Sequence, residues 1–214
     1  MREENIKRML KDKFIAIIRG MEEEKIVPLA EALYNGGFRC IEVTFNLREP
    51  DNHAQTARSI EAIAKRFGNE VLTGAGTVVA PELVDIAADA GALYIVSPNT
   101  DVDVIRRTRE RELVSVPGAL SATECMIAHN AGADFIKLFP TGSMGTGYLK
   151  SLIAPLSHLR FVATGGIDEN NFRDYLKAGA VCIGVGGNLI NKEWIAAGEF
   201  NKITDLAKLY TELS

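Results

Sequence analysis

Short apolar runs alternate with amphipathic stretches along the whole chain. Each run is rich in Val and Ile, as expected for strands that are buried on both faces of a parallel sheet. The eight predicted strands are Phe14–Ile18, Phe38–Val43, Val71–Gly74, Leu93–Val96, Leu113–Val116, Phe135–Leu138, Leu159–Val162 and Val181–Gly184. Stretches between them have helical spacing, for example Glu22–Tyr34, His53–Arg66, Pro81–Ala90, Ala122–Asn130, Gly147–Ile153 and Glu169–Lys177.

Eight alternations of strand and helix predict an α/β fold, the (β/α)8 or TIM barrel, with residues 1–214 as one domain. We expect a short N-terminal helix at residues 3–11 to cover the barrel bottom and the tail from about Lys192 to supply the last helix. A doubly wound open sheet is the alternative. It is disfavoured because the strand count reaches eight and no GxGxxG sequence follows the first strand.

A glycine follows four of the predicted helices and marks a recurring helix-to-strand turn. A Gly at this position suits the left-handed conformation that commonly ends a helix. The four turns read Tyr34-Asn-Gly-Gly, Ala90-Gly-Ala, Asn130-Ala-Gly-Ala and Lys177-Ala-Gly-Ala.

Composition excludes several classes of protein. The 47% of apolar residues argues against disorder, and 24 Lys+Arg against 28 Asp+Glu argues against a nucleic-acid binder. No apolar run approaches the ~18 residues of a membrane span, and the N-terminus has no apolar signal region. Cys40, Cys125 and Cys182 lack the spacing of a zinc site and fit reduced thiols. We therefore expect a cytoplasmic protein with no membrane or nucleic-acid partner.

Lys137 and Glu42 are the strongest candidates for catalysis. Each lies in an apolar strand, and strand alternation places Lys137 inside the barrel if Ile136 and Leu138 face the helices. Burial disfavours an ammonium group, so the neutral amine becomes available as a nucleophile toward a carbonyl. Glu42 would point inward from a second strand and serve as a general acid/base. A structural ion pair between the two is the alternative.

Other candidate residues lie where predicted strands end, because the carboxyl ends of barrel strands carry the active site. Glycine-rich turns follow the last two strands, where barrels often bind phosphate through backbone N–H groups. Arg19 and Thr77 indicate a place for the carboxylate of a small acid. The predicted substrate-binding residues are Arg19, Thr77, Pro98, Phe139, Thr164, Gly165, Gly166, Gly186 and Gly187.

The three histidines, His53, His129 and His158, all lie away from predicted strand ends. A histidine proton relay and a histidine-rich metal site are therefore disfavoured. A magnesium site made only of carboxylates is the alternative that the sequence leaves open, although no second acidic residue at a strand end stands beside Glu42. We expect no metal and no other cofactor.

Several motifs, in order along residues 10–190, resemble those of the KDPG/KHG aldolase family. They are Ile41-Glu-Val-Thr44, Gly74-Ala-Gly-Thr-Val78, Ile95-Val-Ser-Pro-Asn99, Val116-Pro-Gly118, Phe135-Ile-Lys-Leu-Phe-Pro140 and Thr164-Gly-Gly-Ile167. The resemblance implies a class I aldolase, a carbon–carbon lyase of carbohydrate metabolism and usually a homotrimer without metal. It implies that Lys137 forms the Schiff base and Glu42 moves protons. Arg19 and Thr77 would hold the pyruvoyl carboxylate, and the glycine turns the phosphate.

The implied reaction cleaves 2-keto-3-deoxy-6-phosphogluconate to pyruvate and glyceraldehyde 3-phosphate, and 4-hydroxy-2-oxoglutarate is a possible further substrate. Cleavage of the 6-phosphogalactonate epimer is the alternative within the family. A phosphosugar isomerase or epimerase, and a non-catalytic sugar-phosphate binder, are the alternatives from other classes. The chain departs from the family in three places. It has Phe45-Asn46 shortly after the Glu-Val-Thr motif, where some members have an Arg, and Ala163, where members often have Pro. It has Gly186-Gly187-Asn188 in the last glycine turn, where many members have a Ser.

Overall fold

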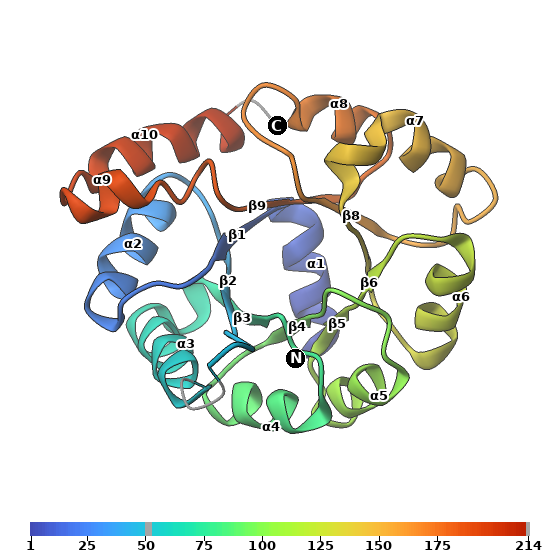
Figure 1. The fold of residues 1–214 in the computed structure, drawn as a ribbon, viewed down its shortest axis with the longest axis horizontal. Helices are drawn as coiled ribbons and strands as arrows, with labels where there is room; N and C mark the ends of the chain where they lie inside the picture. Colours follow the sequence, from blue (N-terminus) through green and yellow to red (C-terminus); the bar gives the residue numbers. More distant parts are fainter. Residues whose placement is uncertain (50–52, 213–214) are drawn as a thin grey trace.

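In the computed structural model, the chain folds into a ring of parallel strands surrounded by helices (Figure 1). The structure describes residues 1–49 and 53–212. The strands are β1 Phe14–Ile18, β2 Cys40–Thr44, β3 Leu72–Gly76, β4 Tyr94–Val96, β5 Val114–Val116, β6 Gly118–Ala119, β7 Ile136–Leu138, β8 Phe161–Thr164 and β9 Cys182–Val185. The helices are α1 Arg2–Asp12, α2 Glu23–Asn35, α3 His53–Phe67, η2 Gly68–Glu70, α4 Pro81–Asp89, α5 Val102–Glu110, α6 Ala122–Ala131, α7 Thr141–Ile153, α8 Phe172–Lys177, α9 Lys192–Ala196 and α10 Phe200–Thr211.

The strand order shows how the sheet closes into a barrel. It runs β5-β4-β3-β2-β1-β9-β8-β7-β6, and its two ends, β5 and β6, are separated in sequence only by Pro117. Proline has no N–H to donate, so it divides what is otherwise a single strand. The segment before it pairs with β4 and the segment after it pairs with β7. The predicted eight-position barrel is confirmed, and a doubly wound open sheet is ruled out.

Several predicted boundaries were wrong by a few residues. Strand β8, Phe161–Thr164, begins and ends two residues later than the seventh predicted strand, Leu159–Val162. Helix α7 begins at Thr141, ahead of the predicted Gly147, and is kinked at Gly145 with φ 77°. Helix α8 begins at Phe172 because Asp168 and Asn171 hydrogen-bond each other in a turn ahead of it.

The predicted glycine turns are confirmed by their backbone angles. Gly37, Gly91, Gly132 and Gly179 have φ between 94° and 109°, the left-handed region that an L-residue rarely adopts. Each turn directs the chain from a helix into the next strand, which fixes the helix-on-strand packing around the ring.

Two apolar clusters show which side chains point into the barrel. The inner cluster contains Cys40 and Phe135, whereas Ile41, Ile136 and Leu138 belong to the outer cluster between strands and helices. Since side chains alternate along a strand, Glu42 and Lys137 point into the barrel, as the sequence predicted.

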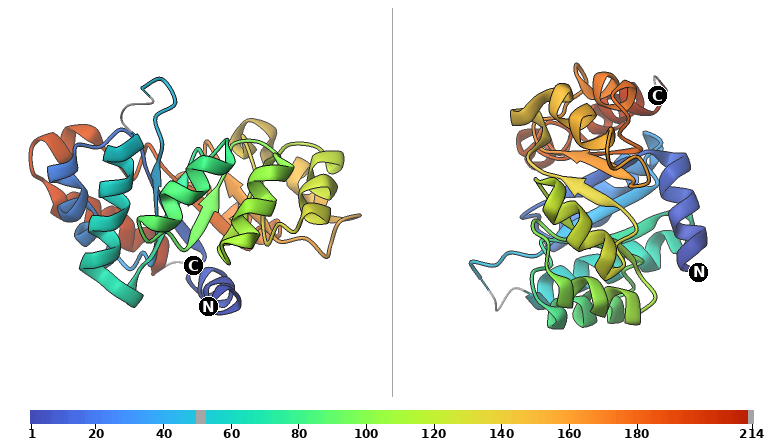
Figure 2. Two further views of the ribbon diagram at one scale, coloured as in Figure 1. Left: turned by 90° about the horizontal axis from the view of Figure 1, so that it is seen from below. Right: turned by 90° about the vertical axis from the view of Figure 1, so that its right-hand side faces the viewer.

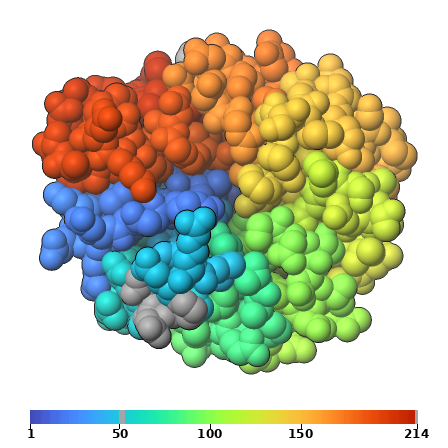
Figure 3. Space-filling view, in the orientation of Figure 1, coloured from blue at the N-terminus to red at the C-terminus, as the bar shows by residue number. Residues whose placement is uncertain are grey.

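Helix α1 covers one end of the barrel, as predicted, through Ile6 and Met9 in the inner cluster. Figure 2 shows α1 at the end opposite the projecting segment that follows β2. That projecting segment stands in front of its neighbours in the space-filling view (Figure 3). The open end of the barrel, at the carboxyl ends of the strands, is therefore the one that faces the viewer. No helix in the described ranges is long and apolar enough to cross a membrane.

Gly36 allows α2 and α10 to approach each other closely, and it yields a stability prediction. A Cβ at Gly36 would lie 2.3 Å from Ala207 Cβ and 2.9 Å from the Thr204 carbonyl oxygen. We expect Gly36→Ala to lower the free energy of unfolding by about 2 kcal/mol, because one helix must shift. Urea unfolding measures this loss. Gly147→Ala is the control, since its Cβ would meet nothing within 4 Å. Equal stability of the two variants would contradict the prediction.

Candidate active site

A cavity of about 460 Å³ opens at the carboxyl ends of the strands. Its lining contains all of the predicted substrate-binding residues together with Lys137. The lining residues are Ile17, Arg19, Thr77, Pro98, Lys137, Phe139, Thr164, Gly165, Gly166, Ile167, Asp168, Gly184, Gly186, Gly187 and Asn188. Residues at the ends of six strands thus meet at one mouth, although the first and last of them, Ile17 and Asn188, are far apart in the sequence.

Lys137 and Glu42 are both buried, with exposed fractions of 7% and 2%. Within the described residues, no carboxylate lies within 4.0 Å of Lys137 Nζ, so the two do not form a closed ion pair. Burial lowers the pKa of Lys137, and the nearby Glu42 charge partly offsets this effect. Burial likewise raises the pKa of Glu42, against the lowering influence of Lys137 and Arg19. Both shifts favour the neutral forms that an amine nucleophile and a proton donor need.

Glu42 is not among the residues that line the cavity, and glycine makes room for its buried carboxylate. The register pairs Glu42 with Gly74 and Thr44 with Gly76. A Cβ on Gly76 would lie 1.7 Å from Glu42 Oε1, so any side chain there would displace the carboxylate. Gly76 is therefore a residue that the sequence reasoning missed as a determinant of the Glu42 position, although it lies inside the quoted Gly74-Ala-Gly-Thr-Val78 motif.

Gly76→Ala tests whether this close packing positions the carboxylate. We expect kcat to fall roughly 10²-fold, since displacing a catalytic group by about 1 Å has effects of this size. Steady-state kinetics measure the change, and Gly147→Ala again serves as control. Wild-type turnover by Gly76→Ala would show that the Glu42 carboxylate tolerates displacement.

Thr77 adopts a conformation that β-branched residues rarely occupy. Its φ is 58°, in the left-handed region, directly after β3. Such strain in a residue at a cavity is a feature of functional sites. The turn places Thr77 in the lining, as expected for a substrate-binding residue.

The loops after β7 and β8 are bound to each other. The Thr141 hydroxyl donates to the Leu138 carbonyl and accepts from the Thr164 N–H at 3.1 Å. The Gly142 N–H donates to the Gly165 carbonyl at 2.7 Å, and a Cβ on Gly142 would lie 2.6 Å from that oxygen. These contacts connect the segment after β7, the strand that carries Lys137, to the Gly165-Gly166 turn.

The two glycine turns present free backbone donors. In the described part of the chain, the N–H groups of Gly165, Gly166 and Gly187 donate to no other protein group. Gly165 and Gly166 have φ of 88° and 73°, which explains the requirement for glycine at both positions. Gly186 and Gly187 have no such angle. A Cβ on Gly187 would meet nothing within 4 Å, and one on Gly186 would only touch Ile17, at 3.8 Å. Converging N–H groups of this kind suit an anion.

Asp168, Ile17 and Gly184 line the cavity but were not predicted as binding residues. Ile17 was detectable, because strand alternation puts it on the inward face of β1. Asp168 gave no signal: it follows the Thr164-Gly-Gly-Ile167 motif in what was predicted to be the approach to a helix. The acidic side chain enters the lining only through the turn ahead of α8.

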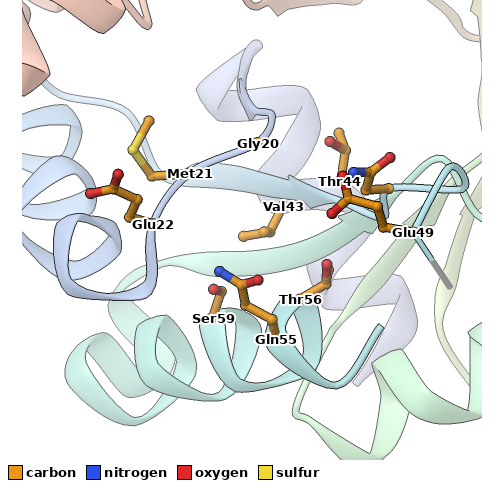
Figure 4. Close-up of a pocket in the computed structure, with 10 residues that line it drawn as sticks. Gly20, Met21, Glu22, Val43, Thr44, Glu49, Gln55, Thr56 and Ser59 are labelled. Carbon is orange, nitrogen blue, oxygen red and sulfur yellow. The ribbon is translucent and has the colours of Figure 1, made fainter. Parts of the chain in front are cut away.

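A second hollow of about 210 Å³ lies between β2, α3 and the segment after β1 (Figure 4). Its lining includes two carboxylates, Glu22 and Glu49, and among the described residues it contains no lysine or arginine. Two carboxylates disfavour an anionic ligand, so this hollow is a poorer place for a phosphorylated acid than the cavity at Lys137.

The histidines lie away from the cavity at Lys137. His129 and His158 are exposed and contact each other with ring centroids 5.0 Å apart, and His53 packs on Phe45. Within residues 1–49 and 53–212, no group of three or more His, Cys, Asp or Glu side chains is placed to hold a metal ion.

Comparison with known proteins agrees with this geometry. The family model described as KDPG and KHG aldolase matches residues 5–206. The chain is 37% identical to the 2-dehydro-3-deoxy-6-phosphogalactonate aldolase of Escherichia coli K12, over 82% of this chain and 83% of that protein. It is also 37% identical to the 2-dehydro-3-deoxy-phosphogluconate aldolase of Treponema pallidum, over 86% and 85%.

A solved structure gives the same result. The KDPG aldolase of Legionella pneumophila, with pyruvate captured as a covalent carbinolamine intermediate, superposes with a TM-score of 0.84 at 30% identity, covering 94% of each chain. With the matching model spanning nearly the whole chain, the protein belongs to the KDPG and KHG aldolase family of carbon–carbon lyases.

Proposed function

We propose that the protein is a class I aldolase that cleaves 2-keto-3-deoxy-6-phosphogluconate to pyruvate and glyceraldehyde 3-phosphate. The observation that carries this proposal is Lys137, a buried lysine with a lowered pKa that lines the cavity inside the barrel. Binding alone gives no reason to bury Lys137 and Glu42 together, since burial of charged groups is costly.

The reaction begins with attack of neutral Lys137 Nζ on the C2 ketone of the substrate. Arg19 and Thr77 hold the adjacent carboxylate at the mouth, which aligns the ketone with the amine. Glu42 donates a proton to the carbinolamine hydroxyl, which leaves as water. The product is a protonated imine between Nζ and C2.

Cleavage follows because the iminium accepts electrons. Glu42, now ionised, removes the C4 hydroxyl proton, directly or through a water molecule. The C4–O bond becomes a carbonyl, the C3–C4 bond breaks, and its electrons form an enamine on C3 and C2. Glyceraldehyde 3-phosphate departs. Protonation of C3 and addition of water to the imine then release pyruvate and regenerate the Lys137 amine.

Trapping with borohydride tests the proposal. Pyruvate forms the same imine, which borohydride reduces to a stable secondary amine on the lysine. Peptide mass mapping should find the added mass on Lys137 and on no other lysine. Absence of label at Lys137 would refute the imine mechanism and favour an isomerase, an epimerase or a sugar-phosphate binder.

The galactonate epimer is the second candidate substrate. Relatives with the two activities in their names are equally similar to the chain, at 37% identity each. Turnover of both epimers, and of 4-hydroxy-2-oxoglutarate, should be measured side by side. We expect the gluconate epimer to react fastest; faster cleavage of the galactonate epimer would reassign the substrate.

We also propose a homotrimer. Leu120, Ile127 and Met144 are exposed apolar side chains in and around α6 and α7, with exposed fractions of 37%, 44% and 42%. The Tyr148 hydroxyl donates to the Leu120 carbonyl at 2.5 Å, which links α7 to the segment before α6. Light scattering should give three times the 23.3 kDa of one chain. A mass of 23.3 kDa would refute the trimer.

We further propose a cytoplasmic location and a single domain over residues 1–214. Cys40, Cys125 and Cys182 are free, buried thiols, which suits a reducing compartment. Cell fractionation tests the location. Coincident unfolding curves from circular dichroism and from the fluorescence of Trp194 would support one domain.

A further inference from the structure

Few cationic side chains line the substrate cavity, so a phosphate there would depend largely on backbone N–H groups. Among the described residues, the cavity's charged lining consists of Arg19, Lys137 and Asp168, and the buried Glu42 carboxylate acts electrostatically on Lys137. Lys137 must be neutral to attack the ketone, so Arg19 is left to balance both a substrate carboxylate and a phosphate. Asp168 adds a further negative charge on the phosphate side.

The side chain at the end of the second glycine turn already donates to a carboxylate. Asn188 occupies the end of this turn, and its Nδ2 donates to Glu169 Oε2. Glu169 is in turn contacted by the Tyr210 hydroxyl at 3.4 Å. One amide proton of Asn188 is therefore committed to a carboxylate, and the turn offers an anion mainly its backbone N–H groups.

Lys192 lines a second groove, which the Gly186-Gly187 turn borders together with the substrate cavity. A groove of about 260 Å³ is lined by Ile17, Arg19, Gly186, Gly187, Ile190 and Lys192, and it shares the first four of these with the substrate cavity. Lys192 Nζ lies 3.9 Å from the place where a Cβ on Gly20 would be. It thus extends toward the residue after Arg19.

Local hydrogen bonds fix the position of the Lys192 backbone. The Ile190 N–H donates to the Gly186 carbonyl at 3.0 Å, which closes the turn. The Asn191 side chain accepts from the N–H groups of Glu193 and Trp194 at 3.0 and 3.1 Å. In the part of the chain that the structure describes, no carboxylate lies within 4.0 Å of the Lys192 ammonium. Its charge is therefore available to a ligand.

We propose that Lys192 is a specificity-determining residue that binds the phosphate of the substrate from the β1 side of the Gly186-Gly187 turn. This inference rests on the proposed function, since it assumes a phosphorylated keto acid in the cavity. Lys192 supplies a cation in addition to Arg19, and a charge-assisted hydrogen bond of this kind favours a phosphorylated substrate over its unphosphorylated form.

Two substrates that differ only in the phosphate test the proposal. For Lys192→Ala, we expect KM for 2-keto-3-deoxy-6-phosphogluconate to rise about tenfold with kcat nearly unchanged. KM for 2-keto-3-deoxygluconate should stay the same, and Lys192→Arg should restore most of the loss. Lys177→Ala is the matched control, because Lys177 is an exposed lysine at the far end of α8. An equal rise for both substrates, or no rise for either, would overturn the assignment.

A binding measurement separates this inference from the proposed function. Calorimetric titration with inorganic phosphate needs no catalysis, and we expect Lys192→Ala to bind it about tenfold more weakly than wild type. Equal affinity would overturn the role of Lys192 even in an active aldolase. Conversely, weaker phosphate binding by Lys192→Ala, in a protein that borohydride does not label at Lys137, would retain the anion site and refute the aldolase.

Discussion

Replacing Lys137 with Arg should abolish cleavage, with kcat falling by at least ~10⁴-fold, the effect expected when a covalent nucleophile is removed. Arg keeps the positive charge and much of the length of the side chain. Its guanidinium stays protonated in proteins and cannot form an imine with a ketone. The substitution therefore separates chemistry from charge. Coupled measurement of pyruvate release gives kcat, and borohydride trapping gives the imine.

Lys150→Arg is the matched control for this variant. Lys150 is exposed on α7, outside the cavity lining, so its replacement should leave kcat and trapping unchanged. Thermal unfolding of both variants shows whether each retains the fold. Substantial turnover by a folded Lys137→Arg enzyme would contradict imine chemistry at this position and require another nucleophile.

Replacing Glu42 with Gln should lower kcat by roughly 10²–10⁴-fold, the usual contribution of a positioned acid/base. Gln has nearly the same shape but neither takes up nor releases a proton under these conditions. The variant should still form the pyruvate imine, although slowly, because the Lys137 amine remains. Steady-state kinetics and single-turnover trapping distinguish the two effects.

The pH dependence of trapping gives a second result with a definite sign. The rate rises with pH as Lys137 loses its proton, with a midpoint below the ordinary lysine value of 10.5 because burial lowers the pKa. The Glu42 carboxylate acts in the opposite direction and raises the pKa of Lys137. Removing this charge in Glu42→Gln should therefore move the midpoint to lower pH.

Glu42→Asp provides the control for charge. It keeps the carboxylate, so its midpoint should stay closer to wild type than that of Glu42→Gln, while its shorter side chain still impairs proton transfer. A midpoint that moves upward in Glu42→Gln, or that is identical in all three proteins, would show that Glu42 does not influence the Lys137 ammonium.

Most residues of the cavity could be predicted from the sequence, because the carboxyl ends of all strands in a parallel barrel lie at the same face. Once the apolar runs were counted, Arg19, Thr77 and Lys137 could be assigned to one rim without knowledge of any contact. The glycine turns were recognisable for the same reason, since they follow the last two strands. Side-chain alternation correctly placed Glu42 and Lys137 inside, a conclusion that the two separate apolar clusters support.

Residues whose role depends on a close contact with a segment remote in sequence could not be predicted in this way. Gly76 reads as one glycine among 19. The register pairs Glu42 with Gly74, and only the three-dimensional structure shows that the Glu42 carboxylate reaches Gly76. Lys192 likewise reads as the start of a surface helix. Its proximity to Gly20 depends on β1 lying beside β9, a neighbour relation that exists only after the barrel closes.

The sequence by itself therefore determined the alternation of strands and helices, the direction of each strand side chain and the identity of the chemical groups at the mouth. These follow from periodicity, which is a local property of the chain. The tertiary structure decided how deeply Lys137 and Glu42 are buried, how they shift each other's pKa and which cations border the second glycine turn. Such properties depend on distances between segments that are remote in sequence, and these distances are set by packing of the closed barrel.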